Sequence, residues 1–159
     1  MINILVLCTG NSARSILAEA LLNARGTGRV QAWSAGSNPS GQVHHQTLEV
    51  LRHNKLPVDG LRSKGWQEFT APGAPELDLV VTVCANAAGE TCPIWPGAPL
   101  TAHWGVDDPA AAPPDQIDLA FRAAYHRLRE RIDAFLARPV ETMDRTALAT
   151  HVHEVGRTA

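Results

Sequence analysis

Hydrophobic and polar residues follow one another along the chain in blocks that predict strands and helices in alternation. Residues 2–7, INILVL, form a short apolar run rich in branched side chains, which is typical of a strand buried on both faces. The segment 14–25 then carries apolar side chains at the spacing of one helical face: Leu17, Ala20, Leu21 and Ala24. The chain therefore opens with a strand, a short turn and a helix.

The same alternation continues further along the chain. Further strands are predicted over 30–36, 77–83 and near 98–104, and further helices over 45–54 and 115–137. The last of these helices is the clearest, because its apolar residues recur at steps of three and four: Ile117, Phe121, Ala124, Leu128, Ile132 and Phe135. This order predicts an α/β fold, a parallel sheet with helices on both faces.

The chain length of 159 residues fits one domain. We assign residues 1–139 to it, and we expect residues 140–159, where the periodicity fades, to form a loosely held C-terminal tail. In doubly wound sheets, ligands bind beyond the carboxyl ends of the strands, where the strand order reverses. If the second and third strands flank the first, Cys8, Cys84 and the GVDDP segment at 105–109 face one crevice.

Composition excludes several classes of protein. The chain is 45% hydrophobic and 19% charged with a net charge of -2, so it has neither the basic excess of a nucleic-acid binder nor a disordered composition. No run of about 18 apolar residues and no basic leader is present, which argues against a membrane span or a secretory signal. Three cysteines are too few for a disulfide framework, so we expect a cytoplasmic protein with reduced thiols.

The turn after the first strand has the character of an anion site. Between Cys8 and Arg14 stand only small residues, which let successive backbone N–H groups curl inward at the start of a helix: Thr9, Gly10, Asn11, Ser12 and Ala13. The helix dipole and the Arg14 guanidinium would add positive charge for a tetrahedral oxyanion. The same field is expected to favour the Cys8 thiolate. The spacing lacks the Gly-Lys-Ser/Thr ending of a Walker loop.

Four segments in order resemble one known family. VLCTGNSARS at 6–15 looks like the phosphate-binding loop of the low-molecular-weight tyrosine phosphatase superfamily, more closely that of its arsenate reductase branch. The likeness extends to WSAGS at 33–37, VVTVCANAAGETCP at 80–93 and HWGVDDPA at 103–110. The resemblance implies a four-stranded parallel sheet flanked by helices and the reduction of arsenate to arsenite, for arsenic detoxification.

The resemblance also implies a relay of three thiols. Cys8 attacks arsenate, Cys84 then attacks the Cys8 sulfur as arsenite leaves, and Cys92 takes over the resulting disulfide by thiol exchange. An external thiol reductant, thioredoxin or glutathione with glutaredoxin, restores the thiols, and no bound cofactor or metal is implied. Considered alone, Cys84 and Cys92 are equally consistent with small core residues or, less well, with zinc ligands beside His103.

Further residues match supporting positions of the family. The Asp-Pro step resembles the family's acid position and selects Asp108 as the general acid, with Asp107 as its neighbour. A solvated loop pair is the alternative explanation of both. Asn11, Glu19 and Ser34 match residues that brace the anion loop, in some members around a potassium ion. Lys64 stands where those members carry an aspartate, so it is either a tethered replacement for the ion or an exposed lysine. Ser15 either hydrogen-bonds the Cys8 thiolate or serves the helix start.

Two other functions compete with arsenate reduction. A phosphatase acting on phosphotyrosine or another phosphomonoester needs only Cys8, Arg14 and an aspartate. An arsenite sensor could use three thiols to chelate the ion, but the sequence offers no basic helix pair for DNA. We therefore expect an arsenate reductase with no nucleic-acid or membrane partner.

Overall fold

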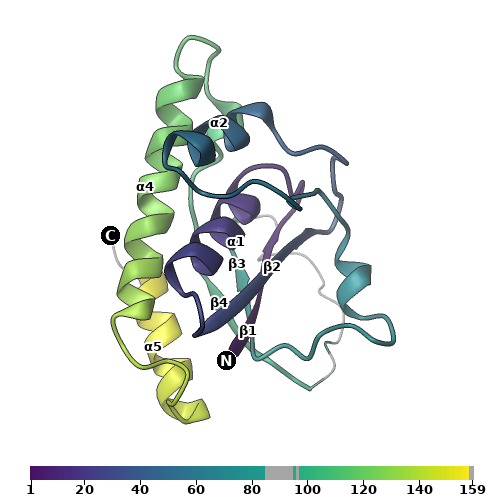
Figure 1. The fold of residues 1–159 in the computed structure, drawn as a ribbon, viewed down its shortest axis with the longest axis vertical. Helices are drawn as coiled ribbons and strands as arrows, with labels where there is room; N and C mark the ends of the chain where they lie inside the picture. Colours follow the sequence, from purple (N-terminus) through teal and green to yellow (C-terminus); the bar gives the residue numbers. More distant parts are fainter. Residues whose placement is uncertain (85–94, 96, 158–159) are drawn as a thin grey trace.

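A single parallel sheet of four strands forms the centre of the protein (Figure 1). The computed structural model describes residues 1–84, 95 and 97–157. The strands are β1 (Ile2–Cys8), β2 (Val30–Gly36), β3 (Leu79–Thr82) and β4 (Leu100–His103). Each lies inside the predicted range or within one residue of it, so the predicted parallel sheet is confirmed.

The strand order is β2-β1-β3-β4, so successive strands are added on one side of β1 and then on the other. The switch point of the sheet therefore lies between β1 and β3. β1 pairs with β2 over its full length, from Ile2 opposite Val30 to Cys8 opposite Gly36. On its other side β1 pairs with β3, with Leu7 opposite Thr82. The segments that follow β1, β3 and β4 therefore emerge at one edge of the sheet, as the topology argument requires.

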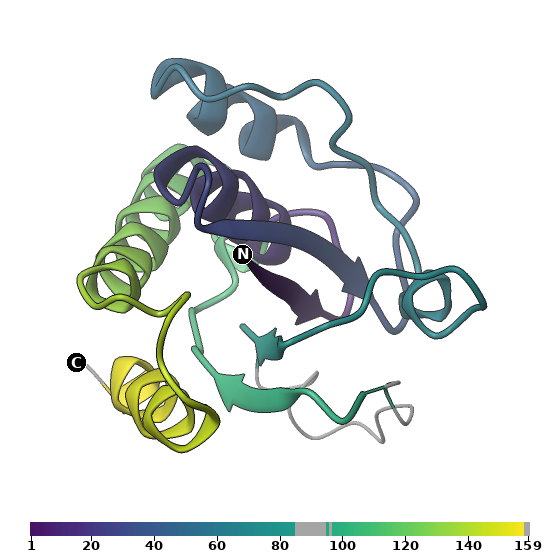
Figure 2. The same ribbon diagram turned by 60° about the horizontal axis from the view of Figure 1, so that its bottom comes forward.

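Two hydrophobic clusters pack on opposite faces of the sheet because successive side chains of β1 point in opposite directions. Ile4 and Val6 face the cluster formed with the helices, whereas Leu5 and Leu7 face a smaller cluster with Phe69. The helices are α1 (Arg14–Arg25), α2 (His45–His53), α4 (Ile117–Leu136) and α5 (Arg145–Arg157), with 3-10 turns η1 (Trp66–Phe69) and η2 (Pro109–Ala111). Figure 2 shows α1, α4 and α5 on the same side of the sheet. Within the described residues, the other face is covered by η1 and loops, so the expectation of helices on both faces is wrong for this part of the chain.

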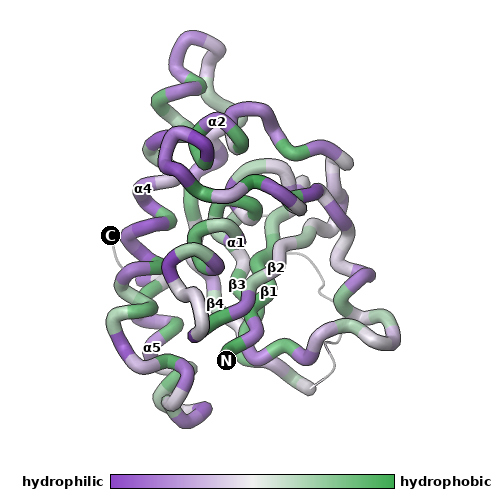
Figure 3. The backbone as a smooth tube through the Cα atoms, viewed as in Figure 1, coloured by the Kyte–Doolittle hydropathy of each residue, from purple (hydrophilic) through white to green (hydrophobic). Residues whose placement is uncertain are grey.

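Hydrophobic residues concentrate along the strands and on α1, whereas α4 carries many hydrophilic residues (Figure 3). This fits the one-sided burial of α4. Five residues of the predicted stripe are buried, together with Tyr125, whereas Ile117 is only partly buried. The five are Phe121, Ala124, Leu128, Ile132 and Phe135. Among the described residues no helix is both long and apolar enough to cross a membrane.

The segment after Pro139 differs from the loosely held tail expected from the sequence. Residues 145–157 form α5, which packs against β4 and α4 through a buried face: Leu148, His151, Val152 and Val155. Trp104 Nε1 donates a hydrogen bond to the Val152 carbonyl at 2.9 Å, and His151 Nε2 contacts the Phe135 carbonyl at 2.9 Å. The spacing of the buried face is helical, but two histidines and small polar residues obscured it.

The backbone of α5 comes very close to β4. A Cβ atom added to Gly156 would lie 2.4 Å from the His103 carbonyl oxygen, so only glycine fits at this crossing. Beside it, His153 Nε2 lies 3.0 Å from the Thr101 carbonyl oxygen. The C-terminal helix is therefore joined to the last strand of the sheet by backbone contact as well as by packing.

Candidate active site

Cys8 is the last residue of β1, and the loop that follows it is held from outside by its carbonyl groups. The Thr9, Gly10 and Ser12 carbonyls accept backbone hydrogen bonds of 2.9–3.0 Å from the amides of Asn38, Ser40 and His44, respectively. The Thr47 hydroxyl donates a second bond to the Ser12 carbonyl at 2.8 Å. Each of these carbonyls thus points away from the centre of the loop.

Because these carbonyls point out of the loop, the N–H groups of the residues that follow them point toward its centre. In a trans peptide the N–H of the next residue points opposite to the carbonyl, so the N–H groups of Gly10, Asn11 and Ala13 face inward. Asn11 has a positive φ of 44°, the left-handed conformation that curls successive amides into an anion-binding concavity. Cys8 itself is 6% exposed at the base of this loop. This backbone arrangement is compatible with the anion loop predicted from the sequence.

Gly36, at the end of β2, allows this strand to lie very close to the loop that follows Cys8. A Cβ atom there would lie 2.4 Å from the Thr9 carbonyl oxygen and 3.0 Å from that of Cys8. The Gly36 amide donates to the Lys64 carbonyl at 2.9 Å, which brings the 62–65 segment to the same place. Sequence reasoning missed the role of Gly36, and the only sequence signal for it is its position at the end of a predicted strand.

Asn11 is fully buried and connects three parts of the chain. Its side-chain amide donates to Ser15 Oγ at 2.9 Å and to Ser34 Oγ at 3.0 Å, and its Oδ1 accepts from the Lys64 amide at 2.8 Å. These bonds hold the strained backbone of Asn11 in place. Ser15 thus accepts from Asn11, and the helix start at Ala13 has no side-chain cap. Neither role considered for Ser15 from the sequence describes this contact.

Glu19, Ser34 and Lys64 form a buried polar group beneath the loop. The Ser34 hydroxyl donates to Glu19 Oε1 at 2.6 Å, and Lys64 Nζ lies 3.6 Å from the same oxygen. Lys64 Nζ also donates to the Arg62 carbonyl at 3.2 Å, and the residue is only 7% exposed. Burial lowers the pKa of the Lys64 ammonium, while the negative charge of Glu19 acts in the opposite direction.

Arg14 reaches from the start of α1 to the segment after β4. Its Nη1 donates to the Val106 carbonyl at 2.9 Å, and its Nη2 lies 3.8 Å from Asp108 Oδ2. Asp108 Oδ1 accepts from the Ala110 amide at 3.0 Å, which caps η2 and fixes the carboxylate beside Arg14. The contact with Val106 is made by a backbone carbonyl, so no residue type in the sequence predicts it. Asp107 is exposed and has no contact of this kind with Arg14 among those the structure shows.

The topology brings Cys84 beside Cys8. The Val83 amide donates to the Leu7 carbonyl at 3.0 Å, which continues the β1–β3 pairing to the end of both strands. Cys84 is 3% exposed, and its Sγ lies 3.7 Å from Oγ1 of Thr9, the residue after Cys8. The two residues are thiols that are not bonded to each other. Cys92 lies outside the described residues.

The pKa of the Cys8 thiol is raised, whereas a lowered pKa was expected from the sequence. The hydrogen bond with Cys84 raises the pKa of Cys8, burial raises it further, and the charge of Arg14 lowers it. The expectation of a lowered pKa considered the loop alone and omitted the second thiol. The neighbouring thiol and burial therefore oppose formation of the Cys8 thiolate, whereas the charge of Arg14 favours it.

The described residues contain no cluster of three or more His, Cys, Asp or Glu side chains suited to a metal ion. His103, considered above as a zinc ligand, places its Nδ1 2.7 Å from the Thr82 hydroxyl. The site therefore offers thiols, a guanidinium, inward amides and a carboxylate. This set can bind a tetrahedral oxyanion, attack it with sulfur and protonate a leaving oxygen.

Comparison with known proteins agrees with this geometry. Residues 3–148 match the family model of the low molecular weight phosphotyrosine protein phosphatases. A protein named arsenate reductase from Bacillus licheniformis is 31% identical over 137 residues, which are 86% of this chain and 93% of that protein. A solved arsenate reductase in the phosphate binding state superposes with a TM-score of 0.69 at 25% identity, over 86% of this chain and 98% of the other.

A thioredoxin-dependent arsenate reductase from Corynebacterium glutamicum superposes with a TM-score of 0.59 at 25% identity, over 87% of this chain and 64% of that one. Both superpositions show that this chain shares the overall fold of those two proteins. The match to the family model covers both the loop after β1 and the segment after β4 that meets it. The chain belongs to the low molecular weight phosphotyrosine protein phosphatase family.

Proposed function

We propose that this protein is an arsenate reductase in which Cys8 is the nucleophile and Cys84 the second thiol. The observation that carries the proposal is the position of two buried free thiols at the ends of the paired strands β1 and β3, with Cys84 Sγ 3.7 Å from the hydroxyl of Thr9, the residue after Cys8. A phosphatase needs one thiol at this position, whereas reduction of arsenic(V) to arsenic(III) needs two electrons, which two thiols supply when they form one disulfide. The relatives named arsenate reductase support the same choice.

The first step binds arsenate in the loop and forms a sulfur–arsenic bond. The inward amides of Gly10, Asn11 and Ala13 and the Arg14 guanidinium hold the oxyanion. The Cys8 thiolate attacks arsenic and displaces one oxygen, which takes a proton and leaves as water. Asp108, 3.8 Å from Arg14, is the proposed donor of that proton.

The second step moves the electron pair. The Cys84 thiolate attacks Cys8 Sγ, a sulfur–sulfur bond forms, and the sulfur–arsenic bond breaks. Its electron pair goes to arsenic, which leaves as arsenite, and the two sulfurs are oxidised to a disulfide. Because the two cysteines end strands that pair directly, we expect this bond to form with little movement of the strands.

The third thiol completes the proposed cycle. Cys92 attacks Cys84, frees Cys8 and carries the oxidation to a disulfide that an external reductant opens. Thioredoxin is one candidate, because a relative of similar fold is thioredoxin-dependent, and glutathione with glutaredoxin is the other. The relay depends on a reducing compartment, so we propose the cytoplasm as its location.

Lys64 is proposed to replace a potassium ion beneath the loop. Its ammonium lies against Glu19, whose Oε1 also accepts from Ser34, and Ser34 in turn binds the Asn11 amide. A positive charge at this point holds the Glu19 carboxylate and, through Ser34, the orientation of Asn11. This assignment uses the burial of Lys64, which separates it from an exposed surface lysine.

The alternative is a phosphatase acting on a phosphomonoester, which the family name and the Cys8, Arg14 and Asp108 set favour. In that reaction water hydrolyses the phosphocysteine, and Cys84 has no chemical step. The Cys84→Ser variant separates the two functions, because it stops reduction and leaves phosphomonoester hydrolysis intact.

The test is arsenate-dependent oxidation of reductant, followed with thioredoxin and glutaredoxin systems in parallel for the wild type and each Cys→Ser variant. We expect turnover to vanish in the Cys8 and Cys84 variants. The Cys92 variant is expected to complete a single turnover, leaving the Cys8–Cys84 disulfide visible by mass spectrometry. Hydrolysis of p-nitrophenyl phosphate by the same proteins is the control for an intact loop. Full arsenate turnover by Cys84→Ser would overturn the mechanism.

A further inference from the structure

Thr47, on α2, has a buried hydroxyl that binds the anion loop. The residue is fully buried, and its Oγ1 donates a hydrogen bond to the Ser12 carbonyl at 2.8 Å. The His44 amide donates to the same carbonyl at 3.0 Å. A carbonyl oxygen has two lone pairs, so these two donors use both of them and fix the direction of the Ser12 carbonyl. The N-terminal end of α2 thus holds one peptide group of the loop.

The peptide group held in this way leads into α1. It joins Ser12 to Ala13, the N-cap residue of α1, whose side chain cannot cap the first amides of the helix. The first amides of a helix have no acceptor within the helix and are available to an anion. In a trans peptide the Ala13 N–H points opposite to the Ser12 carbonyl, and therefore toward the centre of the loop. The direction of this amide thus depends on the two donors from α2.

Packing alone does not explain a threonine at position 47. The neighbouring residues on the buried face of α2 are apolar, with Val50 3% exposed and Leu51 fully buried. Valine has nearly the same shape as threonine and can be buried without the cost of removing a hydroxyl from water. A buried hydroxyl is tolerated where it has a partner, which here is the Ser12 carbonyl. The hydroxyl is therefore explained by its contact with the loop and not by the core.

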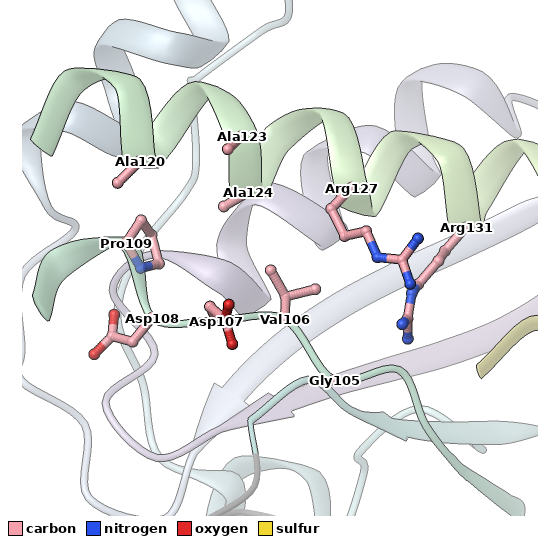
Figure 4. Close-up of a pocket in the computed structure, with 10 residues that line it drawn as sticks. All are labelled: Gly105, Val106, Asp107, Asp108, Pro109, Ala120, Ala123, Ala124, Arg127 and Arg131. Carbon is pink, nitrogen blue, oxygen red and sulfur yellow. The ribbon is translucent and has the colours of Figure 1, made fainter. Parts of the chain in front are cut away.

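The support behind Thr47 is tighter than the support behind Arg14. Arg14 binds the Val106 carbonyl on the segment after β4, which Figure 4 shows beside α4. A cavity of about 560 Å³ lies between that segment and α4. In contrast, α2 is anchored in the hydrophobic core by Val50 and Leu51. Because close-packed interiors yield little, the Thr47 hydroxyl is a fixed point for the loop.

We propose that Thr47 is a positioning residue of the anion loop, whose hydroxyl sets the direction of the Ala13 amide toward a bound tetrahedral oxyanion. N–H donors that already point at the anion stabilise it well, because they need not reorient when it binds. Without the hydroxyl the Ser12 carbonyl keeps one of its two donors, and the peptide group gains freedom to rotate. This role rests on the proposed function only in requiring that the loop binds an oxyanion.

The test is a sulfate titration of the reduced full chain, followed by its backbone amide signals in nuclear magnetic resonance spectra at an ionic strength matched with chloride. Sulfate is expected to shift the signals of Gly10, Asn11 and Ala13 in the wild type. Thr47→Val is expected to weaken sulfate binding about tenfold, with the greatest loss of shift at Ala13. Thr47→Ala, a second variant without the hydroxyl, should match it. Thr47→Ser restores the hydroxyl and should recover the affinity.

Val50→Ala is the matched control, because Val50 lies on the same buried face of α2 and its side chain forms no hydrogen bonds. It should lower the melting temperature and leave sulfate binding unchanged. Equal sulfate affinity in Thr47→Val and the wild type would overturn the role of Thr47, as would a Thr47→Ser variant that binds as weakly as Thr47→Val. A wild type without these shifts would refute the oxyanion site itself, and the proposed function with it. Sulfate undergoes no turnover, so the result does not depend on the reduction of arsenate.

Discussion

The Lys64 ammonium lies 3.6 Å from the Glu19 carboxylate beneath the anion loop, and both side chains are largely buried. Such a pair couples the stability of the fold to the geometry of the site. Loss of the ammonium leaves a carboxylate in a place that water scarcely reaches. The same carboxylate holds Ser34, and Ser34 holds Asn11 in its left-handed conformation.

Lys64→Met is therefore expected to destabilise the protein by about 3 kcal/mol and to reduce arsenate turnover, because removal of one member of a buried ion pair leaves the other charge uncompensated. Urea unfolding and initial rates measure the two effects. Wild-type turnover should be the same in potassium and sodium buffers, since the ammonium already occupies the position of the ion. Lys55→Met, at the other lysine of the chain, is the exposed control. A clear potassium dependence of the wild type would remove this role of Lys64.

The pKa of Cys8 is expected to fall when Cys84 is replaced by alanine. The hydrogen bond with Cys84 is the largest cause of the raised value, and its removal leaves Arg14 as the dominant charge. The pH dependence of Cys8 alkylation, located by mass spectrometry in a Cys92→Ala background, measures the shift. The midpoint should move to lower pH in Cys84→Ala than in the parent protein. A midpoint that stays in place would show that the neighbouring thiol does not control Cys8.

His44 is expected to make folding stability depend on pH below about pH 6.5, the ordinary value for histidine. Its Nδ1 accepts a hydrogen bond from the Gln46 amide at 3.1 Å, so protonation removes the cap of α2. Burial and the neighbouring His45 lower the pKa of His44, whereas Asp108 raises it. The unfolded chain thus binds the proton more readily, and stability falls as pH drops from about 6.5 toward the folded-state pKa.

Urea unfolding of wild type and His44→Asn across this pH range tests the assignment. Asparagine keeps an N-cap acceptor but does not titrate, so the variant should lose less stability on acidification. His53→Asn, at an exposed residue of the same helix, should behave as the wild type does. Parallel curves for wild type and His44→Asn would contradict the prediction.

Arg14→Lys is expected to reduce kcat/KM for arsenate by about a hundredfold or more, because lysine lacks the planar fork that holds an oxyanion and a carbonyl together. The wild-type guanidinium already uses Nη1 on the Val106 carbonyl, so a point charge cannot satisfy both partners. Steady-state kinetics measures the loss. Arg25→Lys, in an exposed ion pair with Asp133, is the control and should retain activity.

Gly156→Ala is expected to destabilise the fold by about 1–3 kcal/mol, a cost typical of an inserted methyl group in a packed contact. The new Cβ would meet the His103 carbonyl oxygen and separate α5 from β4. Thermal unfolding measures the loss, and Glu154→Ala, at an exposed position of α5, is the comparison. Equal melting temperatures for the two variants would show that the contact is not tight in solution.

Much of the fold could be predicted because its signals are local. β1, α1 and α4 have strong apolar periodicity, and the rule for parallel sheets then places Cys8 and Cys84 at one edge. The anion loop is equally local, since small residues between a strand and a helix define it. These parts of the site needed no knowledge of distant contacts.

The remainder of the site depends on contacts that residue types do not reveal. The Val106 carbonyl that holds Arg14 is a backbone group, and the burial of Lys64 depends on the return of a loop to Gly36. The raised pKa of Cys8 arises from a neighbour 76 positions later in the chain. α5 was missed because its buried face includes His151, a polar residue that stacks on Phe135.

The position of α5 has a consequence for association between copies of the chain. β4 is an edge strand, and its bonds to β3 use the amides of Leu100 and Trp104, so the Thr101 amide and carbonyl point outward by alternation. An outward row of this kind can pair with a strand of another molecule and start aggregation. His153 already contacts the Thr101 carbonyl, so a foreign strand must first displace the C-terminal helix.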